Sequence, residues 1–262
     1  MKHGVLSMID LTVHPQQLER AVQRARENRI VIPTFAQMRD PALIPEAIKK
    51  QLRHVGLWDV NPLNLFRISW HNEPTMNGGA YGPVNFIELP SVLTGVKARI
   101  IVLCGKWFPT GCHKVGASFG CLAPRLVTGQ FDPTYNKAVW PSTGNYCRGG
   151  AYNSKLLGCE SVAILPAEMS KERFDWLSKI AGEVIATPGC ESNVKEIFDK
   201  TWELRRTRKD VVIFNQFEEM GNVLWHYQVT GKAIADAYES LKTDSTRFAG
   251  ACFTSGSAGT MS

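Results

Sequence analysis

Residues 160–189 read ESVAILPAEMSKERFDWLSKIAGEVIATPG, and this stretch decides the fold class. ESVAILP (160–166) is a nearly continuous apolar run of strand length, and EVIATPG (183–189) is a second one that ends in turn residues. Between them, SKERFDWLSKIAG (170–182) has helical spacing, with Ser170 in the position of an N-cap. A strand, a helix and a strand in close succession predict a βαβ unit with parallel strands and a right-handed crossover.

The same alternation continues on both sides of this unit. Further strands are expected at KAVWPST (137–143), DVVIFNQF (210–217) and RFAGACFTSG (247–256), and further helices at 145–158, 192–207 and 231–241. Upstream, we expect ARIIVLCGK (98–106) to be a buried strand and VGASFGCLAPRLV (115–127) a buried helix. Val/Ile-rich strands separated by helices predict an α/β fold with a mainly parallel sheet that helices cover on both faces.

The first 95 residues are less regular. HPQQLERAVQRARENRI (14–30) and DPALIPEAIKKQLRHVG (40–56) are expected to be helices, and HNEPTMNGGAYGPVN (71–85) is expected to be a loop.

Composition and charge restrict the classes of function. The chain has 262 residues, 44% of them hydrophobic, which suffices for one large or two modest domains. The net charge is +6, and RRTRK (205–209) is the only dense basic run. Because this run has no interleaved aromatic residues, we expect it to be a solvated helix end and we expect no nucleic-acid partner.

Seven scattered cysteines without a C-x-x-C pair argue against a disulfide framework and against a structural zinc site, so reduced thiols and no metal are expected. The opening residues, MKHGVLSMIDLTVHP, lack the apolar run and cleavage site of a signal peptide. No apolar run approaches the roughly 20 residues that span a bilayer. We therefore expect a soluble, cytoplasmic protein with no membrane partner.

Three short segments carry residues suited to chemistry, each at the carboxyl end of a predicted strand, where α/β sheets bind ligands. They are PTGCHKVG (109–116) with Lys114, PSTGN (141–145) and TSGSAGT (254–260). Each also has a plain structural explanation: a lysine whose ammonium reaches solvent, an N-cap with a glycine turn, and a flexible polar tail. Together, an amine that can be desolvated and two small-residue anion sites suit pyridoxal phosphate with an amino acid.

The same segments resemble motifs of the fold type II pyridoxal-phosphate-dependent enzymes, the family of cysteine synthase, cystathionine β-synthase, threonine dehydratase and the tryptophan synthase β-subunit. PTGCHKVGAS is similar to the Schiff-base lysine segment of the tryptophan synthase form. PSTGN with the downstream GGA is similar to the substrate loop of cysteine synthase, and NQFEEMGNVLWHYQVTG (215–231) to that enzyme's Asn-Gln-Phe segment. GSAGT (256–260) stands where the family has its glycine-rich phosphate loop. The resemblance is closest overall to cysteine synthase-like proteins.

The resemblance implies a role for each matching position. Lys114 would form the Schiff base with pyridoxal 5′-phosphate and later move the substrate's Cα proton. Asn145 would hydrogen-bond to the 3′-oxygen of the cofactor, and the substrate carboxylate would be held by Ser142, Thr143, Gly144 and Gln216. The phosphate would be bound by Gly256, Ser257, Ala258, Gly259 and Thr260.

Three further features leave alternatives open. His113 would either lie near the phosphate or be a histidine beside the site whose hydrogen bonds are made within the protein. His226 is expected to be structural. A Cys112–His113 nucleophile pair is the alternative chemistry, but no third orienting residue is recognisable. Ala258 replaces a glycine of the phosphate loop, which the loop would tolerate if the φ of Ala258 is negative.

The resemblance also implies a two-lobed fold type II architecture with mainly parallel sheets. Because the chain ends at Ser262, immediately after the phosphate loop, we expect this fold to be cut short at the C-terminus. Residues 1–85 would be an N-terminal extension, 86–136 plus 236–262 a part of the large domain, and 137–235 the small substrate-binding domain.

The implied function is pyridoxal-phosphate-dependent β-elimination or β-replacement on a small amino acid such as serine, O-acylserine or cysteine, in a homodimer. Two alternatives stay open: a dehydratase-type lyase acting on serine or threonine, and an inactive or incomplete relative that binds the cofactor or a partner.

Overall fold

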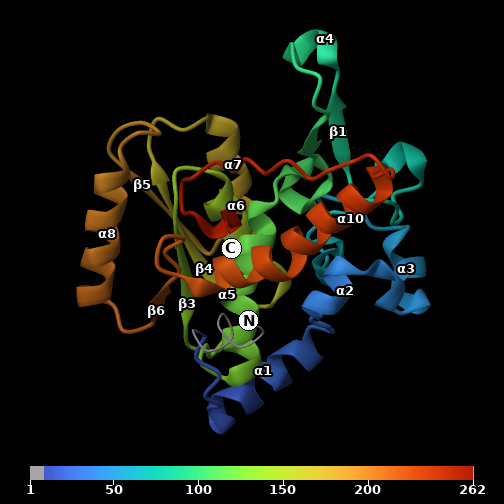
Figure 1. The fold of residues 1–262 in the computed structure, drawn as a ribbon. Helices are drawn as coiled ribbons and strands as arrows, with labels where there is room; N and C mark the ends of the chain where they lie inside the picture. The colour runs from blue at the N-terminus through green and yellow to red at the C-terminus, as the bar shows by residue number, and fades with distance from the viewer. Residues whose placement is uncertain (1–8, 262) are drawn as a thin grey trace.

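The centre of the protein is a four-stranded parallel sheet, seen in a computed structural model that describes residues 9–261 (Figure 1). The strand order is β5–β4–β3–β6, with β3 at Lys137–Pro141, β4 at Glu160–Pro166, β5 at Glu183–Thr187 and β6 at Val211–Ile213. Val139 of β3 lies opposite Val162 on one side and Ile213 on the other. The predicted α/β fold with a parallel sheet is confirmed. The first eight residues, which carry most of the segment inspected for a signal peptide, lie outside the described residues.

Helices cover both faces of this sheet, which is why its strands are apolar throughout. On one face, α8 (Val194–Thr207) packs Ile197 and Leu204 against valines and isoleucines of β3, β4 and β6. The other face is covered by α6 (Asn145–Leu156) and α7 (Lys171–Ile180), and α5 (Lys114–Thr128) packs against α6. Ser170 occupies the predicted N-cap position of α7, but its side chain makes no capping hydrogen bond.

The C-terminal part contains the predicted helix at 231–241, but the predicted strand that should follow it is absent from the described residues. Two α-helices, α9 (Met220–Trp225) and α10 (Gly231–Leu241), are joined by a π-helical turn at His226–Thr230. The predicted strand at 247–256 is wrong, because these residues have no strand beside them to pair with. Phe248 instead packs edge-on against Tyr238 of α10, with ring centroids 5.7 Å apart.

The N-terminal part consists of short helices. α1 (Pro15–Glu27) confirms the first predicted helix and packs against α5. The second prediction, one helix over 40–56, is wrong: the structure has α2 (Phe35–Arg39), a 3₁₀ turn at Pro41–Leu43 and α3 (Glu46–Leu52). The break has a physical cause, since Pro45 has no N–H to donate and stands as the N-cap of α3. Two more 3₁₀ turns, Pro62–Arg67 and Thr75–Asn77, follow.

A two-stranded antiparallel hairpin projects from the rest of the chain (Figure 1). It is formed by β1 (Phe86–Leu89) and β2 (Ile100–Leu103), with the short helix α4 (Ser91–Thr94) at its tip. The expectation of a buried strand at 98–106 is wrong about burial. Ile100 is 37% exposed and Val102 43%, because each strand has one neighbour and no helix covers the ribbon.

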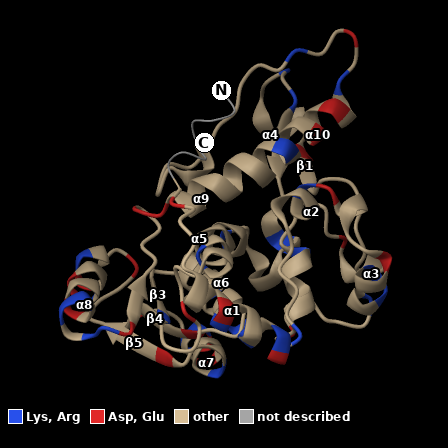
Figure 2. Cartoon of the chain, turned by 90° about the horizontal axis from the view of Figure 1, so that it is seen from below, with Lys and Arg blue, Asp and Glu red and all other residues tan. Residues whose placement is uncertain are grey.

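Basic and acidic residues are interspersed along the outer helices, as on α8 (Figure 2). In the basic run, Arg205 pairs with Glu218 at 3.1 Å, and Arg208 pairs with Glu183 at 2.8 Å and with Asp210 at 2.9 Å. These ion pairs neutralise much of the run. No helix in residues 9–261 combines the length and the apolar character that crossing a membrane requires.

Candidate active site

Lys114 is the first residue of α5, and its side chain is half-buried. The chain reaches it through a tight turn in which Thr110 and Gly111 have positive φ values of 68° and 71°. Burial lowers the pKa of Lys114, and the neighbouring Cys112 and Cys121 oppose this effect. No carboxylate in the described part of the chain forms an ion pair with this amine. Burial therefore makes this amine easier to deprotonate than that of an exposed lysine.

Two histidines adjoin this lysine, and both are held neutral. The ring centroids of His113 and His226 are 5.5 Å apart. Burial, followed by the charge of Lys114, lowers the pKa of His113 to about 4. Burial, followed by His113 and Lys114, lowers the pKa of His226 to about 3. Since the charge of Lys114 acts on both rings, the amine and the two imidazoles occupy one region.

Hydrogen bonds and stacking fix the orientation of the two imidazoles. The ring of His113 stacks on Trp70, with centroids 5.9 Å apart. A hydrogen bond of 2.9 Å joins His226 Nδ1 to Thr230 Oγ1, and Trp70 Nε1 donates to the same hydroxyl at 3.1 Å. The expected structural role of His226 agrees with these bonds, but the residue also approaches the predicted phosphate loop.

The predicted phosphate loop, residues 256–260, folds back onto α9 and the π-helical turn. Thr260 Oγ1 lies 3.5 Å from His226 Nε2. Asn222 Nδ2 donates to Ser257 Oγ at 3.0 Å. Gly259 is buried against Asn222, and a Cβ at position 259 would stand 2.6 Å from that amide. The hydroxyl of Thr260 is thus placed beside His226, and the hydroxyl of Ser257 beside Asn222.

The backbone conformation of Ala258 differs from the expected one. Its φ is +59°, in the left-handed region, whereas tolerance of alanine had been tied to a negative φ. A Cβ in this region costs roughly 1–2 kcal/mol relative to glycine. The loop therefore keeps the backbone conformation of a glycine at a position that carries an alanine.

The predicted substrate loop connects β3 to α6. Ser142 is buried, and its Oγ accepts the N–H of Gly144 at 3.2 Å. The carbonyl of Thr143 accepts a hydrogen bond from Arg173 at 3.2 Å. Asn145 begins α6 and is exposed, so the structure places it at the open side of this loop.

Helix α6 locks the substrate loop to the lysine segment. Asn153 Nδ2 donates to the carbonyl of Val115 at 2.7 Å, one residue after Lys114. The two helix backbones approach so closely at Gly149 that a Cβ there would stand 3.0 Å from the carbonyl oxygen of Lys114. The loop that opens α6 and the amine that opens α5 are therefore held in a fixed relation.

Asn222, a residue that did not stand out in the sequence, connects Gln216 to the same region. The carbonyl of Gln216 accepts a hydrogen bond of 3.1 Å from Asn222 Nδ2, the amide that also holds Ser257. Asn222 thus connects the predicted substrate and phosphate segments. Its place inside the NQFEEMGNVLWHYQVTG motif was a usable signal, whereas Trp70 lies in a segment without any motif.

The alternative Cys112–His113 pair gains little support. Cys112 Sγ lies 3.9 Å from His113 Nδ1, and the pKa of about 4 makes this imidazole a weak base at neutral pH.

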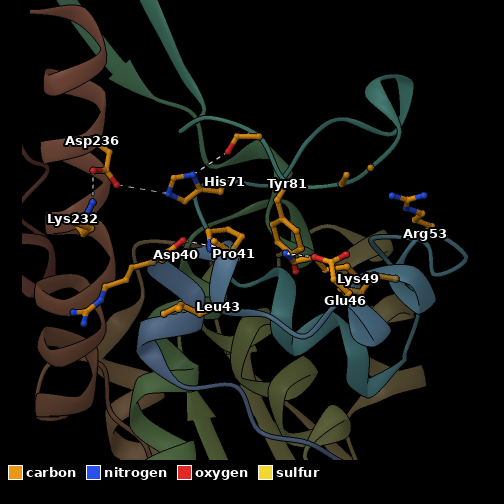
Figure 3. A pocket seen from close by; sticks show the side chains of 16 residues that line it. Asp40, Pro41, Leu43, Glu46, Lys49, Arg53, His71, Tyr81, Lys232 and Asp236 are labelled. Carbon is orange, nitrogen blue, oxygen red and sulfur yellow. Dashed lines mark hydrogen bonds and ion pairs between the residues drawn. The ribbon is translucent and has the colours of Figure 1, made fainter.

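A separate hollow of about 740 Å³ lies between the N-terminal helices and α10, and it contains none of the predicted site residues (Figure 3). Four of its charged side chains pair with one another: Lys49 with Glu46 at 2.8 Å, and Lys232 with Asp236. His71 Nδ1 lies 3.0 Å from the carbonyl of Gly82. This internal pairing makes the hollow a weaker candidate than the region around Lys114.

The comparisons agree with the resemblance that the motifs indicated: the chain is similar in sequence and in fold to fold type II pyridoxal-phosphate-dependent enzymes. It is 27% identical to cystathionine β-synthase of Saccharomyces cerevisiae over 59% of this chain and 31% of that protein. It is 32% identical to cysteine synthase of Staphylococcus aureus over 62% of this chain and 52% of that protein. No protein-family model matches the chain.

A solved structure supports the same class at the level of the fold. A hydrogen sulfide-producing enzyme from Fusobacterium nucleatum superimposes with a TM-score of 0.53 at 21% identity, over 66% of this chain and 52% of that one. The chain spans about a third to a half of the length of the relatives described here.

Proposed function

We propose that the chain binds pyridoxal 5′-phosphate on Lys114 and catalyses β-elimination or β-replacement on a small amino acid. Serine, O-acylserine and cysteine are the proposed substrates. The observation that carries the proposal is the half-buried amine of Lys114, which pairs with no carboxylate of the described residues. Two neutral histidines adjoin it, and one of them, His226, lies 3.5 Å from Thr260 of the 256–260 loop. The similarity to cysteine synthases and cystathionine β-synthases supports it.

The residues present fit the cofactor. Burial lowers the pKa of Lys114, so this lysine gives up its proton more readily, and the unprotonated amine is the form that attacks an aldehyde. The hydroxyls of Ser257 and Thr260, with the backbone of 256–260, are donors suited to a phosphate, and Asn145 would take the 3′-oxygen. His113 and His226 are neutral, so they would contribute hydrogen bonds and no charge. The left-handed φ of Ala258 leaves the loop in a glycine-like conformation.

The chain's own residues would bind the substrate and move its proton. Ser142, Thr143 and Gly144 would bind the substrate carboxylate at the start of α6, with Gln216 beside them. Lys114 Nζ would take the proton from the substrate Cα. Bound pyridoxal phosphate supplies the electron withdrawal that allows a β-substituent to leave.

The test is reconstitution followed by product analysis. The chain is mixed with pyridoxal phosphate, and its visible absorbance is compared with that of Lys114→Ala and of Lys106→Ala, a nearby lysine outside the proposed site. Serine, O-acetylserine and cysteine are then supplied with and without sulfide. We expect a visible band in the parent chain and in Lys106→Ala but not in Lys114→Ala, together with cysteine or keto-acid formation. A colourless parent chain would refute the cofactor proposal, and a band without turnover would leave only an inactive binding protein.

A further inference from the structure

Two arginines meet at the substrate loop. Arg148 lies in the first turn of α6 and Arg173 in the first turn of α7. Arg173 Nη1 donates to the carbonyl of Thr143, and the space beside Gly144 is bounded by the same nitrogen, 3.5 Å from an added Cβ. Burial and then the charge of Arg173 lower the pKa of Arg148, so the two guanidinium groups lie within electrostatic reach of each other.

Aromatic rings hold Arg148 in place without neutralising it. Its guanidinium carbon lies 5.3 Å from the ring centroid of Trp58 and 5.0 Å from that of Trp176. The buried Nε has no hydrogen-bond partner. Contact with ring faces fixes a guanidinium but leaves its donors, which lie in its plane, available for an anion.

Among the described residues, the absence of an ion pair distinguishes the two groups from Arg125 and Arg208, two other partly buried arginines. Arg125 pairs with Glu219 at 2.7 Å and Arg208 with Glu183 at 2.8 Å, whereas no ion pair in residues 9–261 includes Arg148 or Arg173. The carboxylate of Glu172 favours the charged form of Arg148. Its effect on the pKa of Arg148 is smaller than the effects of burial and of the repulsion from Arg173. Two positive charges therefore adjoin the loop without a carboxylate between them, which is unfavourable unless an anion binds.

The arginine pair also adjoins the segment that leads to Lys114. The ring of Trp58, which packs on Arg148, would lie 3.3 Å from a Cβ at Gly111. Cys112 acts electrostatically on Arg148 as well. The pair thus lies between the predicted substrate loop and the approach to the amine, where the β-substituent of a bound amino acid would be.

We infer that Arg148 and Arg173 form a subsite for a phosphate dianion carried on the β-carbon of the substrate. Guanidinium forks match phosphate oxygens, and a phosphate monoester carries about −1.5 to −2 charges at neutral pH, close to the two positive charges of the pair. The inference rests on the proposed function for the amino-acid part of the ligand. O-phosphoserine and hydrosulfide would then give cysteine and inorganic phosphate, the Cβ–O bond breaking with its electron pair on the phosphate.

Binding of inorganic phosphate tests the subsite without any turnover. Tryptophan fluorescence reports it, because Trp58 and Trp176 flank Arg148. We expect saturable quenching or enhancement in the parent chain, and a dissociation constant at least about tenfold higher in Arg148→Gln and Arg173→Gln, as expected for a lost charged hydrogen bond. Arg148→Lys, which keeps the charge and loses the fork, should lie between. Arg206→Gln, the same charge change at an exposed position of α8, is the matched control and should bind like the parent. Equal binding in Arg148→Gln and the parent, or equal weakening in Arg206→Gln, would overturn the inference.

Turnover separates the subsite from the proposed function. In Arg148→Gln, kcat/KM for O-phosphoserine should fall about tenfold relative to that for O-acetylserine, and inorganic phosphate should compete with the former. An equal fall for both substrates would show a structural role and overturn the inference. If no substrate reacts while phosphate binding still depends on both arginines, the proposed function fails and the phosphate subsite stands.

Discussion

Gly149 of α6 lies directly against the backbone of Val115 in α5, where an added Cβ would stand 2.8 Å from the Val115 Cα. No side chain can move away to relieve this contact, since it is backbone on both helices. Gly149→Ala should therefore force α5 and α6 apart, shift Lys114, and cost roughly 1–3 kcal/mol of unfolding free energy. Urea unfolding and the affinity for pyridoxal phosphate measure the two effects.

The matched control is Gly231→Ala at the start of α10. There the nearest atom to an added Cβ, the carbonyl oxygen of His226, is 3.8 Å away. Alanine is the better helix former, so this variant should be neutral or more stable by up to about 1 kcal/mol. Equal behaviour of the two variants would contradict the close approach of α5 and α6.

The two neutral histidines predict how stability depends on pH. Their pKa values fall from 6.5 to about 4 for His113 and about 3 for His226. Between these values and 6.5 the unfolded chain binds protons that the folded chain does not. The free energy of unfolding therefore keeps its full value, as far as these two histidines are concerned, above pH 6.5. It decreases as the pH falls below 6.5, by up to about 1.4 kcal/mol per pH unit for each histidine.

Unfolding free energies measured from pH 7.5 to 4.5 check this dependence. His226→Gln should make the loss of stability on acidification less steep, because one of the two titrating groups is gone. His54→Gln, the same change at an exposed position of the N-terminal part, is the matched control. A slope that is identical in the parent and in His226→Gln would argue against a buried neutral imidazole at 226.

Asn222 and Gln216 should separate two kinds of binding. Gln216→Ala should weaken amino-acid binding by roughly 1.5–3 kcal/mol, the value of a hydrogen bond to a charged group, and leave cofactor affinity as it is. Asn222→Ala removes the amide that holds both Ser257 and the Gln216 carbonyl, so it should weaken both ligands. Titrations with pyridoxal phosphate and then with serine distinguish them. Asn222→Ala affecting serine alone would separate Asn222 from the phosphate loop.

Ala258→Gly tests the strain in the loop. Removing the Cβ at φ +59° relieves roughly 1–2 kcal/mol, and glycine costs about 0.5–1 kcal/mol of backbone entropy on folding. The variant should therefore be more stable by about 0.5–1 kcal/mol and should bind pyridoxal phosphate at least as well. Thermal unfolding gives the first quantity, and a loss of stability would show that residue 258 does not hold this conformation.

The sheet and its helices were predictable because the central strands β3 and β4 are buried on both faces. Val139, Val162 and Ile164 belong to continuous apolar runs, and the connecting helices keep their period. Where the prediction failed, tertiary context decided. The run at 98–106 is as apolar as the others, but it forms an exposed ribbon because only β1 pairs with it. The run at 247–256 has no partner strand at all among the described residues.

The candidate site was predictable to the extent that backbone chemistry fixes it. Glycine and hydroxyl residues at 142–144 and 256–260, and one lysine among small residues, stand out in the sequence. Asn222 and Trp70 did not, because their roles depend on which residues the fold brings beside them. The left-handed φ of Ala258 likewise could not be predicted from the sequence, because the sequence has an alanine at this position.

The most direct test of the central proposal identifies the amine that holds the cofactor. The chain is loaded with pyridoxal phosphate, reduced with borohydride, digested, and mapped by peptide mass spectrometry. Lys114→Ala and Lys114→Arg should both lose the visible absorbance and the label with little loss of stability, since an unpaired, half-buried amine contributes little to folding. We predict the pyridoxyl label on Lys114. A label on Lys106 or Lys155, with Lys114 unmodified, would contradict the account.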